Sequence, residues 1–138
     1  MSAEPWAHLC SLARIDALHL ESVALFGGSA GVRDPGCPEA TLGNAWNACG
    51  YAEIEESLEH VAFAVYLLYY FATKQCFADG NKRIAWLSMC EVLSKLDLEV
   101  QCSDSEGIDL VFALANKKAS LQDAMTWVVD RLGPISKK

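Results

Sequence analysis

The hydrophobic pattern is strongest over residues 61–72, which read VAFAVYLLYYFA. The charged residues Glu59 and Lys74 lie on either side of this run. It is shorter than the roughly 20 residues that a membrane-spanning helix needs. A helix that is apolar on every side is typical of the centre of a helical bundle. We therefore predict a central helix over about residues 54–74, opened by acids that suit a helix N-terminus, namely Glu53, Glu55 and Glu56.

Apolar positions at helical spacing predict further helices before and after this segment. Gly27-Gly28 and Gly133-Pro134 are typical helix stops, and residues 31–38, GVRDPGCP, are dense in turn formers. The additional helices are expected over residues 9–26, 39–48, 81–96, 103–116 and 120–132, with a short extended segment at 98–100. The pattern predicts an all-α single domain over residues 1–138, with five or six helices around a central apolar helix and almost no strand.

The net charge of −7 narrows the range of partners. Binding to duplex DNA or RNA calls for a basic face, so we expect no direct nucleic-acid partner. The short apolar run gives no reason to expect a membrane partner either. One small phosphate ligand at a local basic spot is still compatible with an acidic surface.

The six cysteines are predicted to be free thiols. Their spacing is irregular and contains no CxxC pair, and the N-terminal residues MSAEPWAHLC lack the basic and apolar regions of a secretory signal. Buried thiols in a reducing cytoplasm are the plain explanation. The histidines at positions 8, 19 and 60 are too scattered to predict a zinc site. The cysteines are Cys10, Cys37, Cys49, Cys76, Cys90 and Cys102.

A charged cluster, QCFADGNKR over residues 75–83, separates two apolar segments. The helix expected after its turn presents free N–H groups and a positive dipole end, which favour an anion such as phosphate. Gly80 permits a tight turn and a close approach to a ligand. Lys82 and Arg83 add two cations, and the planar fork of Arg83 suits phosphate oxygens. Asp79 is then a natural ligand for Mg²⁺, which is often held by one carboxylate plus substrate phosphates.

The residues alone leave a second interpretation open. The cluster also fits a capped helix start with a solvated run of charges and with Phe77 buried as a core anchor. Asn81 would cap the helix or hold a neighbouring group in place. In this interpretation Asp79, Asn81, Lys82 and Arg83 are surface residues. A separate alternative makes Arg83 a structural residue tied to a carboxylate in the core.

Residues 77–83, FADGNKR, resemble the signature of the Fic/Doc superfamily, HxFx[DE]GNGRxxR. The resemblance is closer to the death-on-curing (Doc) branch, which has Lys after the Asn, as Lys82 is here, and lacks the second Arg, where this chain has Trp86. Upstream, Gly27-Gly28 and the segment GVRDPG, with Glu39 and Ala40, look like the loop-and-flap region of the family. The flanking helices also fall where the family has them, so the resemblance covers nearly the whole chain.

The resemblance implies an all-helical Fido fold and a nucleotide-dependent transferase with ATP and Mg²⁺ as cofactors. Fic proteins transfer AMP from ATP to a hydroxyl of a target protein, whereas Doc-type toxins bind the nucleotide reversed and transfer its γ-phosphate. The known Doc-type target is the translation factor elongation factor Tu. A short antitoxin neutralises the toxin by laying a helix in its groove.

Carried over by position, the resemblance gives the residues of the cluster expected roles. Asp79 would bind Mg²⁺, and Phe77 would anchor the loop in the core. The phosphates of the nucleotide would be held by Gly80, Asn81, Lys82 and Arg83. An upstream flap would help line the site and align the target, namely Arg33, Asp34, Pro35 and Gly36.

Gln75 occupies the position of the family's motif histidine, which takes the proton from the attacking hydroxyl. Glutamine donates and accepts hydrogen bonds but cannot take up a proton near neutral pH. Loss of a general base costs roughly 10²–10⁴-fold in rate, so a catalytic set of Gln75, Asp79 and Arg83 is expected to be nearly inactive.

Two explanations of this glutamine compete. It was introduced deliberately, because an active toxin kills its expression host, or the chain is a natural non-catalytic relative that binds a nucleotide or a protein partner. The intact FADGNKR favours the first explanation, since a site without catalytic use has less reason to keep these residues together. The wild-type gene sequence would decide between them.

Overall fold

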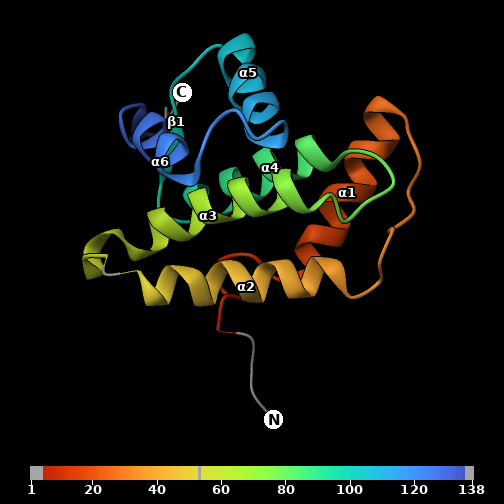
Figure 1. Cartoon of the computed structure of the whole chain (residues 1–138), viewed down its shortest axis with the longest axis horizontal. Coiled ribbons are helices and arrows are strands. Elements are labelled where there is room, and N and C mark those ends of the chain that lie inside the picture. The colour runs from red at the N-terminus through yellow and green to blue at the C-terminus, as the bar shows by residue number, and fades with distance from the viewer. Residues whose placement is uncertain (1–4, 53, 136–138) are drawn as a thin grey trace.

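The computed structural model describes residues 5–52 and 54–135, so the expected acid Glu53 lies outside the described part. The described residues form six α-helices, a short 3₁₀ helix and a two-stranded sheet, which confirms the predicted all-α class (Figure 1). In chain order the elements are α1 (Leu12–Phe26), α2 (Cys37–Tyr51), η1 (Glu56–Leu58), α3 (Glu59–Lys74), α4 (Asn81–Ser94), β1 (Leu98–Val100), α5 (Asp104–Ala115), α6 (Leu121–Val129) and β2 (Leu132–Pro134).

Helix α3 is the centre of the bundle, as its apolar run predicts. It packs against α4, α2, α5 and α6, so nearly every face of the helix meets another element. Burial of apolar surface on all sides is the main force that places α3 there, because a helix of this composition has no face suited to water. Its buried residues are Val61, Ala62, Phe63, Ala64, Val65, Tyr66, Leu67, Leu68, Phe71 and Ala72.

The first half of the chain departs from the predicted helix boundaries at three points. Helix α3 begins at Glu59, not near residue 54, because Glu55 has a non-helical backbone (φ −53°, ψ 137°) and a 3₁₀ turn follows it. Helix α2 is longer than predicted and has Pro38 in its first turn. Backbone N–H groups in the first turn have no partner within the helix, so the missing N–H of proline costs no helical hydrogen bond there. Helix α1 begins later than predicted, after the N-cap Ser11.

The end of the chain contains a strand that the sequence pattern missed. Helix α6 stops at Val129 instead of reaching residue 132. Strand β2 then pairs antiparallel with β1, which was expected to be extended, and Glu99 lies opposite Gly133. Gly133-Pro134, predicted as a helix stop, is therefore part of a strand. The local sequence could not indicate this strand, because its partner lies more than 30 residues upstream.

Helices α5 and α6 begin where the sequence predicts, and each has a capping box. The Ser103 hydroxyl accepts from the Glu106 N–H at 3.2 Å, and the Ser120 hydroxyl accepts from the Asp123 N–H at 3.0 Å. In return, each carboxylate accepts a hydrogen bond from the serine backbone N–H, which lowers the pKa of Glu106 and of Asp123.

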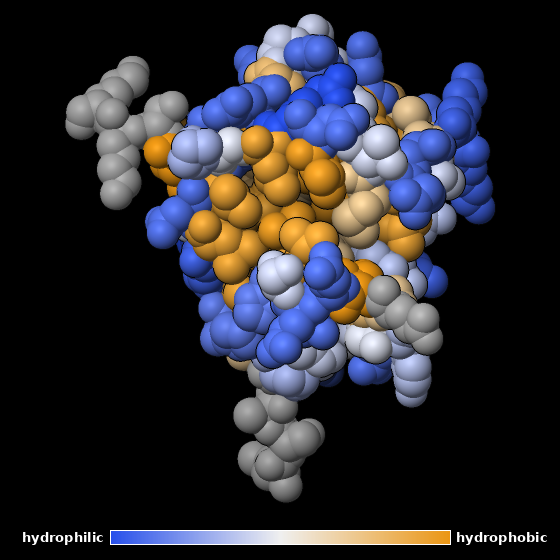
Figure 2. Space-filling model, turned by 90° about the vertical axis from the view of Figure 1, so that its left-hand side faces the viewer, coloured by the Kyte–Doolittle hydropathy of each residue, from blue (hydrophilic) through white to orange (hydrophobic). Residues whose placement is uncertain are grey.

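Two surfaces lie at opposite ends of the molecule. Figure 2 shows an apolar area on the side of the molecule where α2 ends and where α3 and α6 lie. The last residues of α2, η1 and α6, namely Tyr51, Leu58 and Val129, are exposed. At the other end, the loop between α3 and α4 lies next to α1 and to the connection from α1 to α2 (Figure 1). Within residues 5–52 and 54–135, no helix has both the length and the apolar character to cross a membrane.

Candidate functional site

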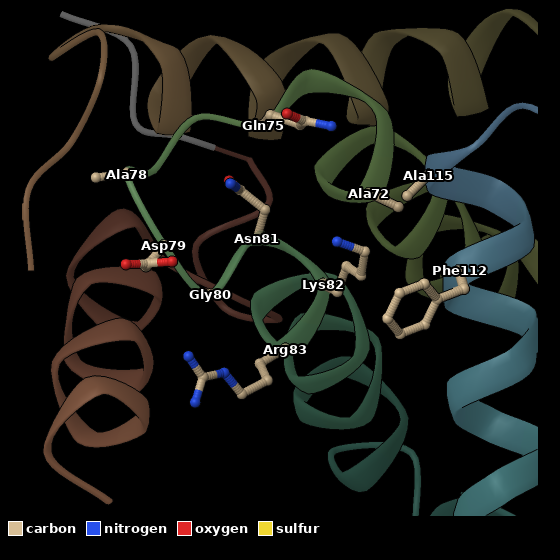
Figure 3. A pocket seen from close by; sticks show the side chains of 10 residues that line it. All are labelled: Ala72, Gln75, Ala78, Asp79, Gly80, Asn81, Lys82, Arg83, Phe112 and Ala115. Atoms are coloured by element: carbon tan, nitrogen blue, oxygen red, sulfur yellow. The ribbon is translucent and has the colours of Figure 1, made fainter. Parts of the chain in front are cut away.

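The loop between α3 and α4, residues 75–80, carries most of the predicted site. Gly80 forms the N-cap of α4 with a left-handed backbone (φ 82°), a conformation that side chains with a Cβ rarely adopt. A pocket of about 420 Å³ opens around this loop (Figure 3). The structure brings six predicted site residues into its lining, which consists of Ala72, Gln75, Ala78, Asp79, Gly80, Asn81, Lys82, Arg83, Phe112 and Ala115.

Asn81 braces the loop from within. Its Oδ1 accepts a hydrogen bond from the Phe77 backbone N–H, and its Nδ2 donates one to the Phe77 carbonyl, both at 2.9 Å. The side chain does not cap α4. Asn81 was expected either to cap the helix or to hold a neighbouring group, and in the structure it holds the backbone of Phe77. The second N–H of its amide stays available to a ligand.

His19 of α1 supports the motif loop, a role that was not predicted from the sequence. Its ring is buried, stacks on Phe77 with centroids 4.0 Å apart, and lies 2.8 Å through Nε2 from the Asp79 carbonyl. Since a carbonyl only accepts, Nε2 must carry the proton in this contact. A signal was present in the sequence: His19 shares the buried face of α1 with Ile15 and Ser22, where a polar ring needs a partner.

Asp79 is held by the connection that follows α1. Its Oδ2 accepts a hydrogen bond from the Ser29 backbone N–H at 3.0 Å. Gly28 has a φ of 109°, and a Cβ at Gly28 would lie only 3.1 Å from the Asp79 Cβ, so glycine is required for this approach. Asp79 is exposed, and its Oδ1 makes no hydrogen bond within the described residues, which leaves this oxygen free for a ligand.

The two cations of the motif face different sides of the pocket (Figure 3). Lys82 lies 4.9 Å from the ring centroid of Phe112 on α5. Arg83 points towards α1, where its guanidinium carbon lies 5.3 Å from the ring centroid of Phe26 and Nη2 donates a long 3.4 Å hydrogen bond to the Gly27 carbonyl. A phosphate chain that met both cations would therefore have to cross the N-terminus of α4.

Neither of these cations is neutralised by a carboxylate in the described part of the chain. The ion pairs found there join Glu91 to Arg14 at 3.0 Å and to Lys95 at 3.3 Å. The alternative in which Arg83 is tied to a core carboxylate is therefore wrong for the described residues. An unpaired guanidinium keeps most of its five donors available to an anion.

Gln75 differs from the rest of the loop in having little support. It caps the C-terminus of α3 in the left-handed region (φ 55°, ψ 56°), which costs a residue with a Cβ about 1–2 kcal/mol. Its side chain is exposed and lines the pocket. Histidine tolerates this backbone region better than most residues, so the loop could accept the family's motif residue at this position.

The flap, residues 31–36, runs beside the motif loop. The Arg33 N–H donates to the Cys76 carbonyl at 2.8 Å, and the Ala78 N–H donates to the Gly31 carbonyl at 2.9 Å. These bonds form an antiparallel bridge between Val32 and Phe77. The four predicted flap residues are exposed and do not line the pocket, so the structure places them at its edge.

A family model for the Fic/DOC family matches residues 10–93. The chain belongs to the Fic/DOC family. The matched segment runs from the start of α1 almost to the end of α4, and it includes the flap and the whole motif loop. Membership in this family generally implies a nucleotide-dependent transferase that modifies proteins and uses ATP with Mg²⁺. Among curated proteins, no sequence matches the chain.

The Fic/DOC motif offers one carboxylate for a metal. Among the described residues there is no group of three or more His, Cys, Asp or Glu side chains that could hold an ion alone. Asp79 with a free Oδ1 fits Mg²⁺, which typically takes one or two carboxylates and completes its octahedron with water and substrate phosphates. The single Asp79 carboxylate therefore suits a Mg²⁺ ion that is also coordinated by the phosphates of a nucleotide.

A disulfide links this Fic/DOC motif to the start of α2, which corrects one prediction. Cys37 and Cys76 are bonded, whereas Cys10, Cys49, Cys90 and Cys102 are free thiols as predicted. The pair is 39 residues apart in sequence but only 5.3 Å apart between Cα atoms, within the range that a disulfide requires. Irregular spacing could not reveal this contact, because the fold alone brings the flap and the motif loop together.

Proposed function

We propose that this Fic/DOC chain binds ATP with Mg²⁺ across the N-terminus of α4 and belongs to the Doc-type toxins, which transfer a phosphoryl group to a hydroxyl of a translation protein. The observation that carries the proposal is the braced loop with Arg83 and Lys82 on either side of the N-terminus of α4, where neither cation pairs with a carboxylate of the described residues. Preference for phosphoryl over AMP transfer rests on Lys82, the residue that resembles the Doc pattern.

The chain's own residues would divide the work of phosphate binding. The backbone N–H groups at the start of α4 and the positive end of its dipole would bind phosphate oxygens. Arg83 would bind from the α1 side and Lys82 from the α5 side, and Asp79 would hold Mg²⁺ through Oδ1. When bound, Mg²⁺ neutralises charge on the phosphate oxygens.

Positioning and charge stabilisation would account for most of the catalysis, because phosphoryl transfer asks little covalent chemistry of the protein. The missing element is a proton acceptor for the attacking hydroxyl. Gln75 can orient that hydroxyl but cannot take its proton. The chain would therefore bind the nucleotide but transfer its phosphoryl group slowly.

The antitoxin would be a helix with an apolar face. Exposed apolar side chains lie at the end of α1, Leu25 and Phe26, and on α5, Ile108 and Phe112. Phe112 lines the pocket, and Phe26 contacts its lining residue Arg83. A helix laid in a groove is held by such spaced apolar anchors. The target would be a factor similar to elongation factor Tu in the cytoplasm, aligned by the flap.

A second candidate function follows from Gln75 itself. If the glutamine is native, the chain is a pseudoenzyme that binds a nucleotide or a protein without turnover. The two candidates predict different behaviour once a base is restored at this position.

The test is the Gln75→His variant incubated with Mg²⁺, purified elongation factor Tu and ATP labelled at either the γ- or the α-phosphate. Label from the γ position on the factor is the expected result. Label from the α position would replace phosphoryl by AMP transfer. Nucleotide binding without label from either position would favour the pseudoenzyme. The Gln75→His, Asp79→Ala double variant is the control and should transfer no label.

A further inference from the structure

The Cys37–Cys76 disulfide lies at the junction of two functional elements. Cys37 is the first residue of α2 and directly follows the flap, and Cys76 stands in the motif loop between Gln75 and Phe77. The bond therefore ties the flap covalently to the motif loop. No element of the bundle core needs this link, because α2 already packs against α3.

The motif loop keeps its own supports if this bond is removed. Asn81 holds both backbone groups of Phe77, and His19 holds the Asp79 carbonyl. Ser29 holds the Asp79 carboxylate. None of these contacts passes through either bonded cysteine, so the phosphate side of the pocket does not depend on the disulfide.

The flap is held mainly by backbone hydrogen bonds and has no buried side chain. Between the flap and the motif loop there are two backbone hydrogen bonds, from Arg33 to Cys76 and from Ala78 to Gly31. The remaining hydrogen bonds of the flap within the described residues are local. The Gly36 N–H donates to Asp34 Oδ1 at 3.1 Å and the Gly31 N–H donates to Ser29 Oγ at 3.3 Å, while the carbonyls of Asp34 and Gly36 accept from the first residues of α2. Residues 31–36 are all exposed, so no buried side chain holds the flap down. Segments with few buried contacts open at low free-energy cost.

We propose that the Cys37–Cys76 disulfide is a reversible redox lock on the flap, which holds the flap against the motif loop when oxidised and releases it when reduced. The phosphate side of the pocket stays formed in both states. This regulation goes beyond the proposed transferase function and holds or fails independently of it.

The reducing step needs a dithiol. Cys76 is 1% exposed, whereas Cys37 is partly exposed, so a thiolate of the reductant attacks the Cys37 sulfur. The Cys37–Cys76 bond breaks, a mixed disulfide forms on Cys37, and Cys76 leaves as a thiolate that takes a proton. The second thiol of the reductant then attacks the mixed disulfide and frees Cys37. The protein gains two electrons and two protons, and the reductant leaves as its own disulfide.

Three of the four remaining cysteines are poor competitors for this bond. Burial raises the pKa of Cys10 to about 12 and those of Cys49 and Cys90 to about 11, so these thiols carry little of the thiolate that exchange requires. A disulfide in a cytoplasmic protein is typically transient and redox-sensing, since glutathione and thioredoxin keep most thiols reduced. A reversible Cys37–Cys76 disulfide is compatible with the cytoplasmic location expected for this protein.

Hydrogen–deuterium exchange on the full chain tests the proposal. The protein is prepared oxidised, with the bond verified by thiol counting, and then compared with the same protein in dithiothreitol. Amides of Arg33 and Ala78 should exchange at least about tenfold faster after reduction, whereas the amides of Phe77 and of α4 should change little. Equal exchange of the flap amides in both states would overturn the proposal, as would six free thiols under oxidising conditions.

Two variants separate loss of the lock from loss of the fold. Cys37→Ser should exchange at the flap like the reduced wild type and should no longer respond to dithiothreitol. Cys102→Ser, which removes a free thiol elsewhere, should keep the full difference between oxidised and reduced states. A response to dithiothreitol that survives in Cys37→Ser would contradict the assignment to this bond.

Discussion

The phosphate side of the pocket and the flap beside it are built in different ways. The phosphate side, residues 79–83, sits on the rigid start of α4 and is fixed by contacts from α1, from the connection after it and from within its own loop. The flap is exposed and is held by backbone bonds and one disulfide. Gln75 belongs to neither group, because it is exposed and strained. Binding and turnover should therefore be separable in this molecule.

The largest expected effect comes from Gln75→His. A restored general base should raise transfer of the nucleotide's phosphoryl group by roughly 10²–10⁴-fold. The rate should rise as the pH passes through about 6.5, because only neutral imidazole accepts a proton. Rates are followed with γ-labelled ATP. Gln75→Asn is the matched control and should show no gain; an equal gain there would mean that residue 75 acts by shape and not as a base.

Reduction of the disulfide should have the next largest effect, on stability. A bond that closes a loop of this length stabilises a fold by about 2–4 kcal/mol, mainly by restricting the unfolded chain. Urea unfolding with and without dithiothreitol measures this difference, and Cys37→Ser should match the reduced wild type. MgATP affinity should be the same in both states. A parallel loss of nucleotide binding would show that the flap and the phosphate side are one unit.

Arg83→Ala should weaken MgATP binding by about ten- to a hundredfold, since a charge-assisted contact is worth about 1.5–3 kcal/mol. The melting temperature without nucleotide should stay nearly unchanged, because among the described residues the side chain makes one long hydrogen bond to Gly27 and one contact with the exposed ring of Phe26. Arg83→Lys should rescue binding in part, as a point charge cannot replace the planar fork. Calorimetry and thermal melts are compared; a large fall in melting temperature would assign Arg83 to the scaffold.

The smallest effect is expected far from the site, at the N-cap of α6. Hydrogen bonds from Ser120 lower the pKa of the Asp123 carboxyl, so its contribution to stability is present above the unfolded pKa of about 3.9 and is lost as the pH falls through the folded value. Asp123→Asn should melt slightly earlier than wild type at pH 7, and the difference should shrink towards about pH 3. MgATP binding should not change, which makes this variant a reference for stability loss without a site effect.

Local signals predicted much of the fold. The run over residues 61–72 identifies the central helix because burial on every side requires an unbroken apolar composition. Ser103 and Ser120 mark helix starts because a cap is a contact between residues three apart. The cluster over residues 75–83 marks the pocket for the same reason, since its chemistry sits on one loop and one helix start.

Contacts between distant segments could not be predicted in this way. Strand β2, the support of Asp79 by His19 and the Cys37–Cys76 bond all join residues far apart in sequence. The late start of α3 could not be predicted either, because Glu55 suits a helix start by composition yet has a non-helical backbone. Each of these depends on how the helices meet, which periodicity and capping do not specify.

The most direct test of the central claim is calorimetry of MgATP binding to the chain as it stands and to Gln75→His. If the phosphate side is formed independently of residue 75, the two affinities should agree within about threefold, or about 0.6 kcal/mol, while transfer differs by orders of magnitude. Absence of binding to the chain with Gln75, or binding that appears only when histidine is restored, would contradict the account.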